Sequence, residues 1–215
     1  MNENMKVRFR FQKTGSAAFI SHLDLMRTLG RALSRAEIPA AKTNGFNPHA
    51  YISIPCALSL GYEGWFEMAD IGLDASYPVE SIPEKLNGVL PDGIRVTEAY
   101  RVTANPRDIA MAEYNLRFTA SDLNYENVCD VLRQKPLVVM KKSKRSEEEK
   151  DISGLIAQVE PAENGIRALL CSSTSESLNP RLLVAALEKY APELQLGHVT
   201  MARGRFFTSD GKEFK

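Results

Sequence analysis

The stretch KVRFRFQ, residues 6–12, alternates between basic or polar side chains and apolar ones. A period of two residues predicts a β-strand with one face toward a core and the other toward solvent. Arg8 and Arg10 lie on the side opposite the apolar residues. We therefore expect a strand with a buried apolar face and a basic outer face. The apolar positions are Val7, Phe9 and Phe11.

The following segment predicts a helix over residues 21–37. Ser21 is a favoured N-cap, and Asp24 lies in the first turn, where negative charge suits the helix dipole. Pro39 closes the element. Apolar residues recur at helical spacing and form the stripe expected to face the core, namely Leu23, Met26, Leu29, Leu33 and Ala36.

The rest of the first half completes the order βαββαβ. This is the ferredoxin-like pattern, in which two helices cover one face of an antiparallel sheet and leave the other face free. The remaining predicted elements are strands at 51–55, 65–73 and 94–101 and a short helix at 79–90.

After a polar linker at 102–108 the pattern begins again, interrupted by the charged segment KKSKRSEEEK at 141–150, which we interpret as a charged hairpin or a mobile loop. We expect an α+β protein of tandem ferredoxin-like repeats with antiparallel sheets, one domain at 1–103 and a second at 108–215. The second half has predicted strands at 114–118, 136–141, 152–159, 166–171 and 196–206 and helices at 122–133 and 179–190.

The net charge is zero, but the charges are unevenly distributed. Residues 1–55 carry eight Lys or Arg against three acids, whereas residues 56–100 carry two against eight. Positive charge gathered on one surface is typical of proteins that bind phosphate groups or acidic partners.

Arg27, Arg31 and Arg35 are spaced by four and predict one row along the helix. The row is either a solvated flank whose arginines pair with acids such as Glu37, or a ridge that faces phosphate groups. The number of cations nearby favours the second interpretation. They are Arg8, Arg10, Lys13 and Lys42.

The stretch KTNGFNPHAYIS, residues 42–53, has the composition of a rigid turn before a strand. Gly45 can supply a positive φ, and the side chains of Asn44 and Asn47 can bond their own backbone. Phe46 either anchors this loop in the core, the role we favour, or stacks on an unpaired base together with His49.

Catalysis and metal binding have little support in the sequence. His22, beside Asp24, and His49 would together allow a metal-free cleavage of RNA by general acid and base. No third ligand at a sensible spacing accompanies the two histidines, so we expect no metal and no cofactor. Cys56, Cys129 and Cys171 are too far apart in sequence for a paired-cysteine motif.

We expect a cytoplasmic protein with no membrane association. The sequence has no run of about 18 apolar residues, which a membrane span needs. Its N-terminal residues are charged and alternating, which does not fit a signal peptide.

The motifs SHLDLxR, RAxxRAxIP and GFNPH, which begin at residues 21, 31 and 45, resemble the bacterial family of unknown function called the radical-SAM-linked proteins, DUF2344. The resemblance is close in the first half and looser in the second. It implies cooperation with a separate radical SAM enzyme that has a cobalamin-binding region. A radical SAM enzyme holds its iron–sulfur cluster with three closely spaced cysteines. This chain lacks such a group, so we do not expect this chain to perform radical SAM chemistry itself.

From these features we expect a non-catalytic RNA-binding accessory module that presents tRNA or rRNA to the radical SAM enzyme. Two alternatives stay open: an RNA-processing enzyme using His22 and His49, and a protein-interaction scaffold whose GFNPH loop docks the radical SAM partner. The RNA hypothesis requires the basic side chains to form one exposed patch beside His49. Its expected contacts are Arg8, Arg10, Arg27, Arg31, Arg35, Lys42, Asn47 and His49.

Overall fold

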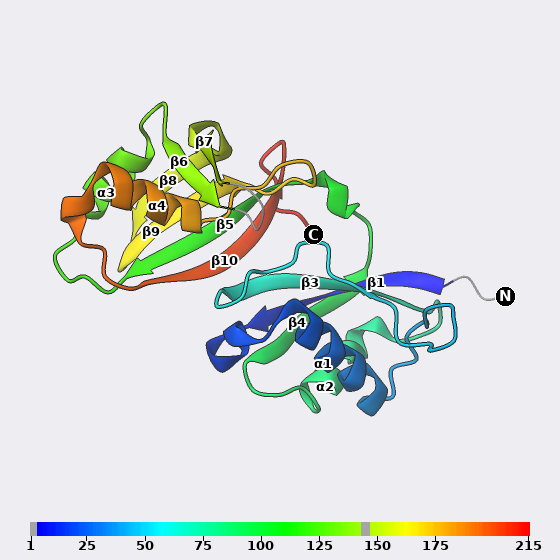
Figure 1. The fold of residues 1–215 in the computed structure, drawn as a ribbon. Helices are drawn as coiled ribbons and strands as arrows, with labels where there is room; N and C mark the ends of the chain where they lie inside the picture. The colour runs from blue at the N-terminus through cyan, green and yellow to red at the C-terminus, as the bar shows by residue number, and fades with distance from the viewer. Residues whose placement is uncertain (1–3, 143–146) are drawn as a thin grey trace. The chain divides into compact units, whose positions relative to one another are not determined.

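The structure is a computed structural model that describes residues 4–142 and 147–215. These residues form a mixed α+β protein with mostly antiparallel strand pairing and four α-helices (Figure 1). The chain divides into two compact units. The first extends to Pro106 and includes Lys215, and the second extends from Arg107 to Phe214.

The sheet of the first unit is built around β1, Asn4–Lys13. It pairs antiparallel with β3, Glu63–Asp74, on one side and with β4, Ile94–Arg101, on the other. The short strand β2, Ile52–Ser53, pairs with β3. The strand order in this unit is therefore β4-β1-β3-β2.

Two α-helices, α1 (His22–Arg35) and α2 (Ile82–Asn87), lie on one side of this sheet (Figure 1). The predicted N-cap of α1 is confirmed, because the Ser21 side chain accepts a hydrogen bond from the Asp24 backbone N–H. Short 3-10 helices precede both elements, at Gly15–Phe19 and Val79–Ser81.

The core of the first unit lies between the sheet and these helices. The predicted apolar face of β1 is confirmed, since Val7, Phe9 and Phe11 are completely buried. They share one hydrophobic cluster with Leu29 and Leu33 of α1. Full burial of a large apolar side chain stabilises the fold by about 1.5–3 kcal/mol, so this cluster is the main support of the unit.

The prediction that Leu23 faces the core is wrong. Leu23 is 65% exposed, and Leu25, at 4%, takes the core position in the first turn of α1. Residue 25 lies four positions before Leu29, which places both side chains on one face of the helix.

The second unit has the strand order β10-β5-β9-β8, with antiparallel neighbours throughout. Its longer helices are α3, Tyr125–Leu132, and α4, Arg181–Tyr190. Its remaining short helices are 3-10 turns at Pro106–Asp108, Ser153–Leu155 and Pro192–Leu194. The strands are β5 (Ile109–Phe118), β8 (Ile156–Ala162), β9 (Gly165–Cys171) and β10 (Val199–Thr208).

Between α3 and β8, the strands β6 (Val138–Lys142) and β7 (Glu147–Asp151) pair antiparallel in a two-stranded sheet of their own. The base of this pair is held by α4, because the Val138 N–H donates to the Tyr190 hydroxyl at 3.1 Å and the Lys189 ammonium donates to the Val138 carbonyl at 2.9 Å. Residues 143–145 of the basic KKSKR tract lie outside the described residues.

Predicted strand lengths differ from the structure in the first unit. The strand predicted at 51–55 is reduced to Ile52–Ser53, and Pro55, which has no N–H to donate, follows it closely. None of the helices in the described part of the chain is long and apolar enough to cross a lipid bilayer.

Candidate binding surfaces of the first unit

Residues 42–50, here called the 42–50 loop, form a closed turn anchored to the sheet. The Thr43 N–H donates to the His49 carbonyl at 2.8 Å, and the His49 N–H donates to the Thr43 hydroxyl at 3.2 Å. The Ala41 N–H donates to the Gly72 carbonyl of β3 at 2.8 Å. These bonds fix both ends of the loop, so the predicted turn is confirmed.

The tip of this loop faces solvent. Phe46 is fully exposed, which contradicts our interpretation of it as an anchor in the core. Gly45 has a φ of +123°, a backbone conformation that L-residues rarely adopt, and it directs the chain outward just before Phe46. Phe46 therefore does not pack in the core and is accessible from solvent.

His49 is also exposed, and its ring is oriented by the loop itself. Its Nδ1 lies 3.2 Å from the Thr43 hydroxyl and 3.2 Å from the Asn47 carbonyl oxygen. Both contacts use the same ring nitrogen, so Nε2 is available to a binding partner. Lys42 and Asn47 are exposed beside it, and Lys42 is the one cation in the sequence of this loop.

The prediction that Arg8 and Arg10 form an exposed basic face is wrong. The Arg8 guanidinium is completely buried and binds Asp70 through two hydrogen bonds of 2.7 and 2.9 Å. Burial disfavours the charged form of Arg8, but the hydrogen bonds and negative charge of Asp70 outweigh it and raise its pKa. Arg10 is 5% exposed and lies 3.3 Å from a Glu98 carboxylate oxygen.

Lys13 is likewise removed from the predicted cationic patch. It is 2% exposed, and its ammonium donates to the Ala18 carbonyl at 2.9 Å. Arg8, Arg10 and Lys13 therefore serve the fold and do not present their charges to a phosphate group.

The arginine row of α1 is exposed, as predicted, but its three members have different surroundings. Arg27 lies 3.1 Å from Asp24 in an exposed ion pair. Arg35 donates to the Val89 carbonyl at 2.8 Å. Arg31 and Arg35 line a shallow hollow together with Thr28 and residues 89–91, which follow α2.

Arg31 and Arg35 lie on a different flank of α1 from β2, the strand that follows the 42–50 loop. Gly30 lies on the flank that faces β2, since a side-chain β-carbon placed there would lie 3.9 Å from Ile52. Arg31 and Arg35 lie on the flank that faces residues 89–91. The structure therefore does not bring the predicted contacts together into one patch beside His49.

The two histidines are not brought together either. His22 begins α1, whereas the 42–50 loop follows the end of α1 and bonds to β3 at Gly72. The 14 residues of α1 separate these ends by roughly 20 Å at 1.5 Å per residue. A shared general acid and base mechanism has no geometric basis here.

The start of α1 carries an apolar surface that the sequence patterns did not identify. Phe19, Leu23 and Leu60 are 72%, 65% and 64% exposed. The Gly61 N–H donates to the Ala18 carbonyl at 2.9 Å, which brings residue 60 beside residue 19. The sequence pattern placed Leu23 in the core stripe of the helix. The structure shows instead that Leu23, in the first turn of α1, faces solvent.

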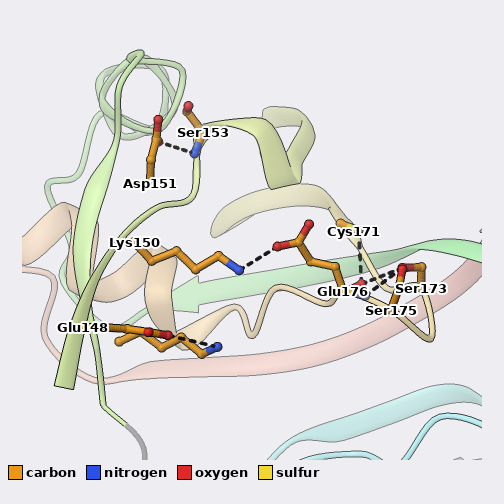
Figure 2. Close-up of polar contacts among 9 residues, drawn as sticks. Glu148, Lys150, Asp151, Ser153, Cys171, Ser173, Ser175 and Glu176 are labelled. Atoms are coloured by element: carbon orange, nitrogen blue, oxygen red, sulfur yellow. Dashed lines mark hydrogen bonds and ion pairs between the residues drawn. The ribbon is translucent and has the colours of Figure 1, made fainter. Parts of the chain in front are cut away.

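The second unit has a compact polar network between β7 and the loop after β9. The Lys150 ammonium lies 2.7 Å from the Glu176 carboxylate, and the Glu176 backbone N–H donates to the Ser173 hydroxyl oxygen at 3.0 Å (Figure 2). Ser173 also lies 3.0 Å from the Ser175 hydroxyl. These groups satisfy one another and tie the loop to the charged strand, so they describe a structural connection rather than a reactive site.

Within the described residues, no group of three or more His, Cys, Asp or Glu side chains could hold a metal ion. The three cysteines are free thiols. Burial raises the pKa of the Cys129 thiol to about 11, which suppresses its thiolate form at neutral pH.

A family profile described as "Uncharacterized protein conserved in bacteria (DUF2344)" matches residues 6–180. The chain belongs to this family. The comparison of this DUF2344 protein with curated proteins gives no match. Among solved structures, the DUF2344 chain is similar to the crystal structure of an unknown protein from Galdieria sulphuraria, with 16% identity and a TM-score of 0.29 over 99% of this chain and 100% of that chain. A TM-score at that level supports no conclusion about fold or function.

Proposed function

We propose that this protein is a non-catalytic docking module that binds a separate radical SAM enzyme through its 42–50 loop. The observation that carries the proposal is the complete exposure of Phe46 on a turn whose base is closed by Thr43 and His49. An aromatic side chain held outward by a rigid loop resembles the anchors that dominate protein interfaces. Because the loop is closed by its own hydrogen bonds, little conformational entropy would be lost on binding.

The charge of the loop favours a protein partner over a nucleic acid. Non-specific affinity for nucleic acid comes from many cation–phosphate contacts, and the loop contributes Lys42 alone. Arg8 and Arg10 are held in ion pairs, and Arg31 and Arg35 line a hollow on another flank of α1. The choice of a radical SAM enzyme as the partner rests on the family resemblance of the SHLDLxR, RAxxRAxIP and GFNPH motifs.

Co-purification of the purified chain with the radical SAM enzyme of the same bacterium, after nuclease treatment, tests the proposal. We expect Phe46→Ala to weaken the complex by at least about tenfold, since anchor aromatics at interfaces carry 2 kcal/mol or more. Phe19→Ala is the matched control, because Phe19 is also an exposed aromatic of the first unit, at the other end of α1. A complex that tolerates Phe46→Ala, or that Phe19→Ala weakens equally, would reject the loop as the contact.

RNA binding is the second candidate, supported by the exposed arginines of α1 and by Phe46 and His49, which suit stacking and hydrogen bonding to an unpaired base. Filter binding with purified tRNA and rRNA over a salt series tests it. A steep loss of affinity with salt, together with a complex that nuclease destroys, would favour RNA over direct protein docking.

We further propose that each unit is a ferredoxin-like repeat. In the first unit this is supported by the element order β1-α1-β2-β3-α2-β4 and the strand order β4-β1-β3-β2. In the second unit the order β10-β5-β9-β8 repeats that arrangement, with the β6 and β7 pair inserted after α3. Tandem repeats would give two sheets, each covered by helices on one face. A cytoplasmic location remains a prediction from the sequence.

A further inference from the structure

A hollow of about 230 Å³ lies between α1 and the segment that follows α2. One wall is formed by Thr28, Arg31 and Arg35, and the other by Val89, Leu90 and Pro91. The hollow thus has cationic and hydroxyl groups on one side and mainly apolar side chains on the other. Figure 1 shows α1 and α2 next to each other on one side of the sheet.

Arg31 and Arg35 differ from Arg27 of the same helix row in their charge partners. Arg27, one turn earlier in the same row, is held by Asp24 at 3.1 Å. In the described residues, neither Arg31 nor Arg35 forms an ion pair with a carboxylate. Arg35 donates one hydrogen bond to the Val89 carbonyl at 2.8 Å. That bond positions the guanidinium at the wall and leaves the remaining N–H donors available.

Helix electrostatics account for only part of this arrangement. A cation in the last turn is stabilised by the helix dipole, which explains Arg35. Arg31 lies a full turn earlier, and two like charges at i and i+4 repel each other. Thr28 lies three residues before Arg31 and so shares its side of the helix. A bound anion would offset the repulsion and accept hydrogen bonds from all three side chains.

We propose that this hollow binds the phosphate group of a phosphate ester, with Arg31 and Arg35 as forked donors and Thr28 as a hydroxyl donor. Guanidinium groups match the oxygens of phosphate geometrically and remain charged at any physiological pH. The hollow is larger than a phosphate group, so the wall of Val89, Leu90 and Pro91 would contact the organic part of the ester. This inference does not depend on the 42–50 loop, because it concerns the other flank of α1.

NMR titration of the full chain with inorganic phosphate, adenosine monophosphate and a short single-stranded RNA tests the proposal. We expect saturable shifts of the Val89 and Leu90 backbone amides and of the Arg31 and Arg35 side chains. Tighter binding of the mononucleotide than of inorganic phosphate would support contact with the apolar wall. Equal binding of the two would overturn the ester assignment.

The RNA arm distinguishes the source of the phosphate. If the oligonucleotide shifts the same signals and the mononucleotide does not, the ligand is a backbone phosphodiester. If the mononucleotide binds as tightly as the RNA, the ligand is a small phosphate ester. Absence of shifts at the hollow with all three probes would reject the site.

Variants make the test specific to the hollow. We expect Arg31→Gln with Arg35→Gln to weaken binding by at least about tenfold, since both charge-assisted contacts are lost. Arg35→Lys should keep only part of the binding, because an ammonium retains the positive charge but not the two parallel N–H donors of a guanidinium. Arg27→Gln is the matched control, since it removes the same charge from the same row outside the hollow. Equal weakening by Arg27→Gln would show a general charge effect and reject the site.

Discussion

Two sets of arginines in the first unit were predicted to face phosphate groups, and the structure separates them. Those of β1 are buried in ion pairs, Arg8 with Asp70 and Arg10 with Glu98. Those of α1 are exposed, and only Arg27 forms an ion pair with a carboxylate in the described residues. The difference comes from the neighbours that each element acquires on folding.

The strand pairings show how this happens. Arg8 lies directly opposite Asp70 of β3, and Arg10 lies directly opposite Glu98 of β4. The basic segment at residues 1–55 therefore contributes a central strand whose two neighbours come from the acidic segment at 56–100. Cross-strand pairs of opposite charge stabilise a sheet. The alternating charge blocks thus partly record strand pairing, and do not by themselves indicate a nucleic-acid surface.

Removing the partner of Arg8 should give the largest effect. We expect Asp70→Ala to lower the free energy of unfolding by about 3–5 kcal/mol, because it leaves a buried guanidinium without its carboxylate. Urea denaturation followed by circular dichroism measures this.

The paired replacement Arg8→Met with Asp70→Leu is the control for that experiment. Replacing both charges by apolar side chains avoids the unpaired buried charge, so most of the stability should be retained. If Asp70→Ala alone costs less than about 1 kcal/mol, Arg8 is not a buried structural cation in solution, and the contrast with α1 fails.

The strand and helix of the first unit were predictable because their signals are local. The alternation of residues 6–12 and the Ser21 cap each depend on a few neighbouring side chains, and both are confirmed. The strand at Ile94–Arg101 has the predicted limits for the same reason.

The environments of individual side chains were not predictable in the same way. The burial of Arg8 depends on Asp70, which is 62 positions away in the sequence. Phe46 was assigned to the core by its residue type, but its loop is closed beneath it by the hydrogen bonds of Thr43 and His49. The burial of Arg8 is set by a tertiary contact and the exposure of Phe46 by the hydrogen bonds within its loop, and neither can be read from periodicity or composition.

The start of α1 carries an exposed ion pair between Asp24 and Arg27 and the N-cap Ser21. Substitutions there should lower the free energy of unfolding less than loss of the buried Arg8 pair. We expect Ser21→Ala to lower the free energy of unfolding by about 1 kcal/mol through loss of the N-cap. The Ser21 hydroxyl also bonds the Asp24 carboxylate at 2.7 Å and, with Arg27, lowers the pKa of Asp24.

The pH dependence of this cap has a defined sign. Because the folded pKa of Asp24 is depressed, its stabilising contribution is present above the ordinary aspartate range and is lost as the pH falls through the folded value. Carboxyl NMR titration should show the pKa of Asp24 rising in Ser21→Ala and also in Arg27→Gln, because each substitution removes a hydrogen bond to the carboxylate. An unchanged pKa in Ser21→Ala would show that the Ser21 hydroxyl does not stabilise the charged carboxylate.

Arg31 should give the smallest effect on stability and the clearest contrast with Arg8. We expect Arg31→Glu to leave the free energy of unfolding unchanged or to raise it by up to about 0.5 kcal/mol, because it replaces a repulsive i, i+4 pair with Arg35 by an attractive one. The same substitution should abolish phosphate binding at the hollow, which NMR titration measures. A cost above about 1 kcal/mol would place Arg31 in a structural role like that of Arg8. A stability gain with loss of binding would mean that the native arginine is retained at a small cost to the fold, as expected for a residue selected to contact a ligand.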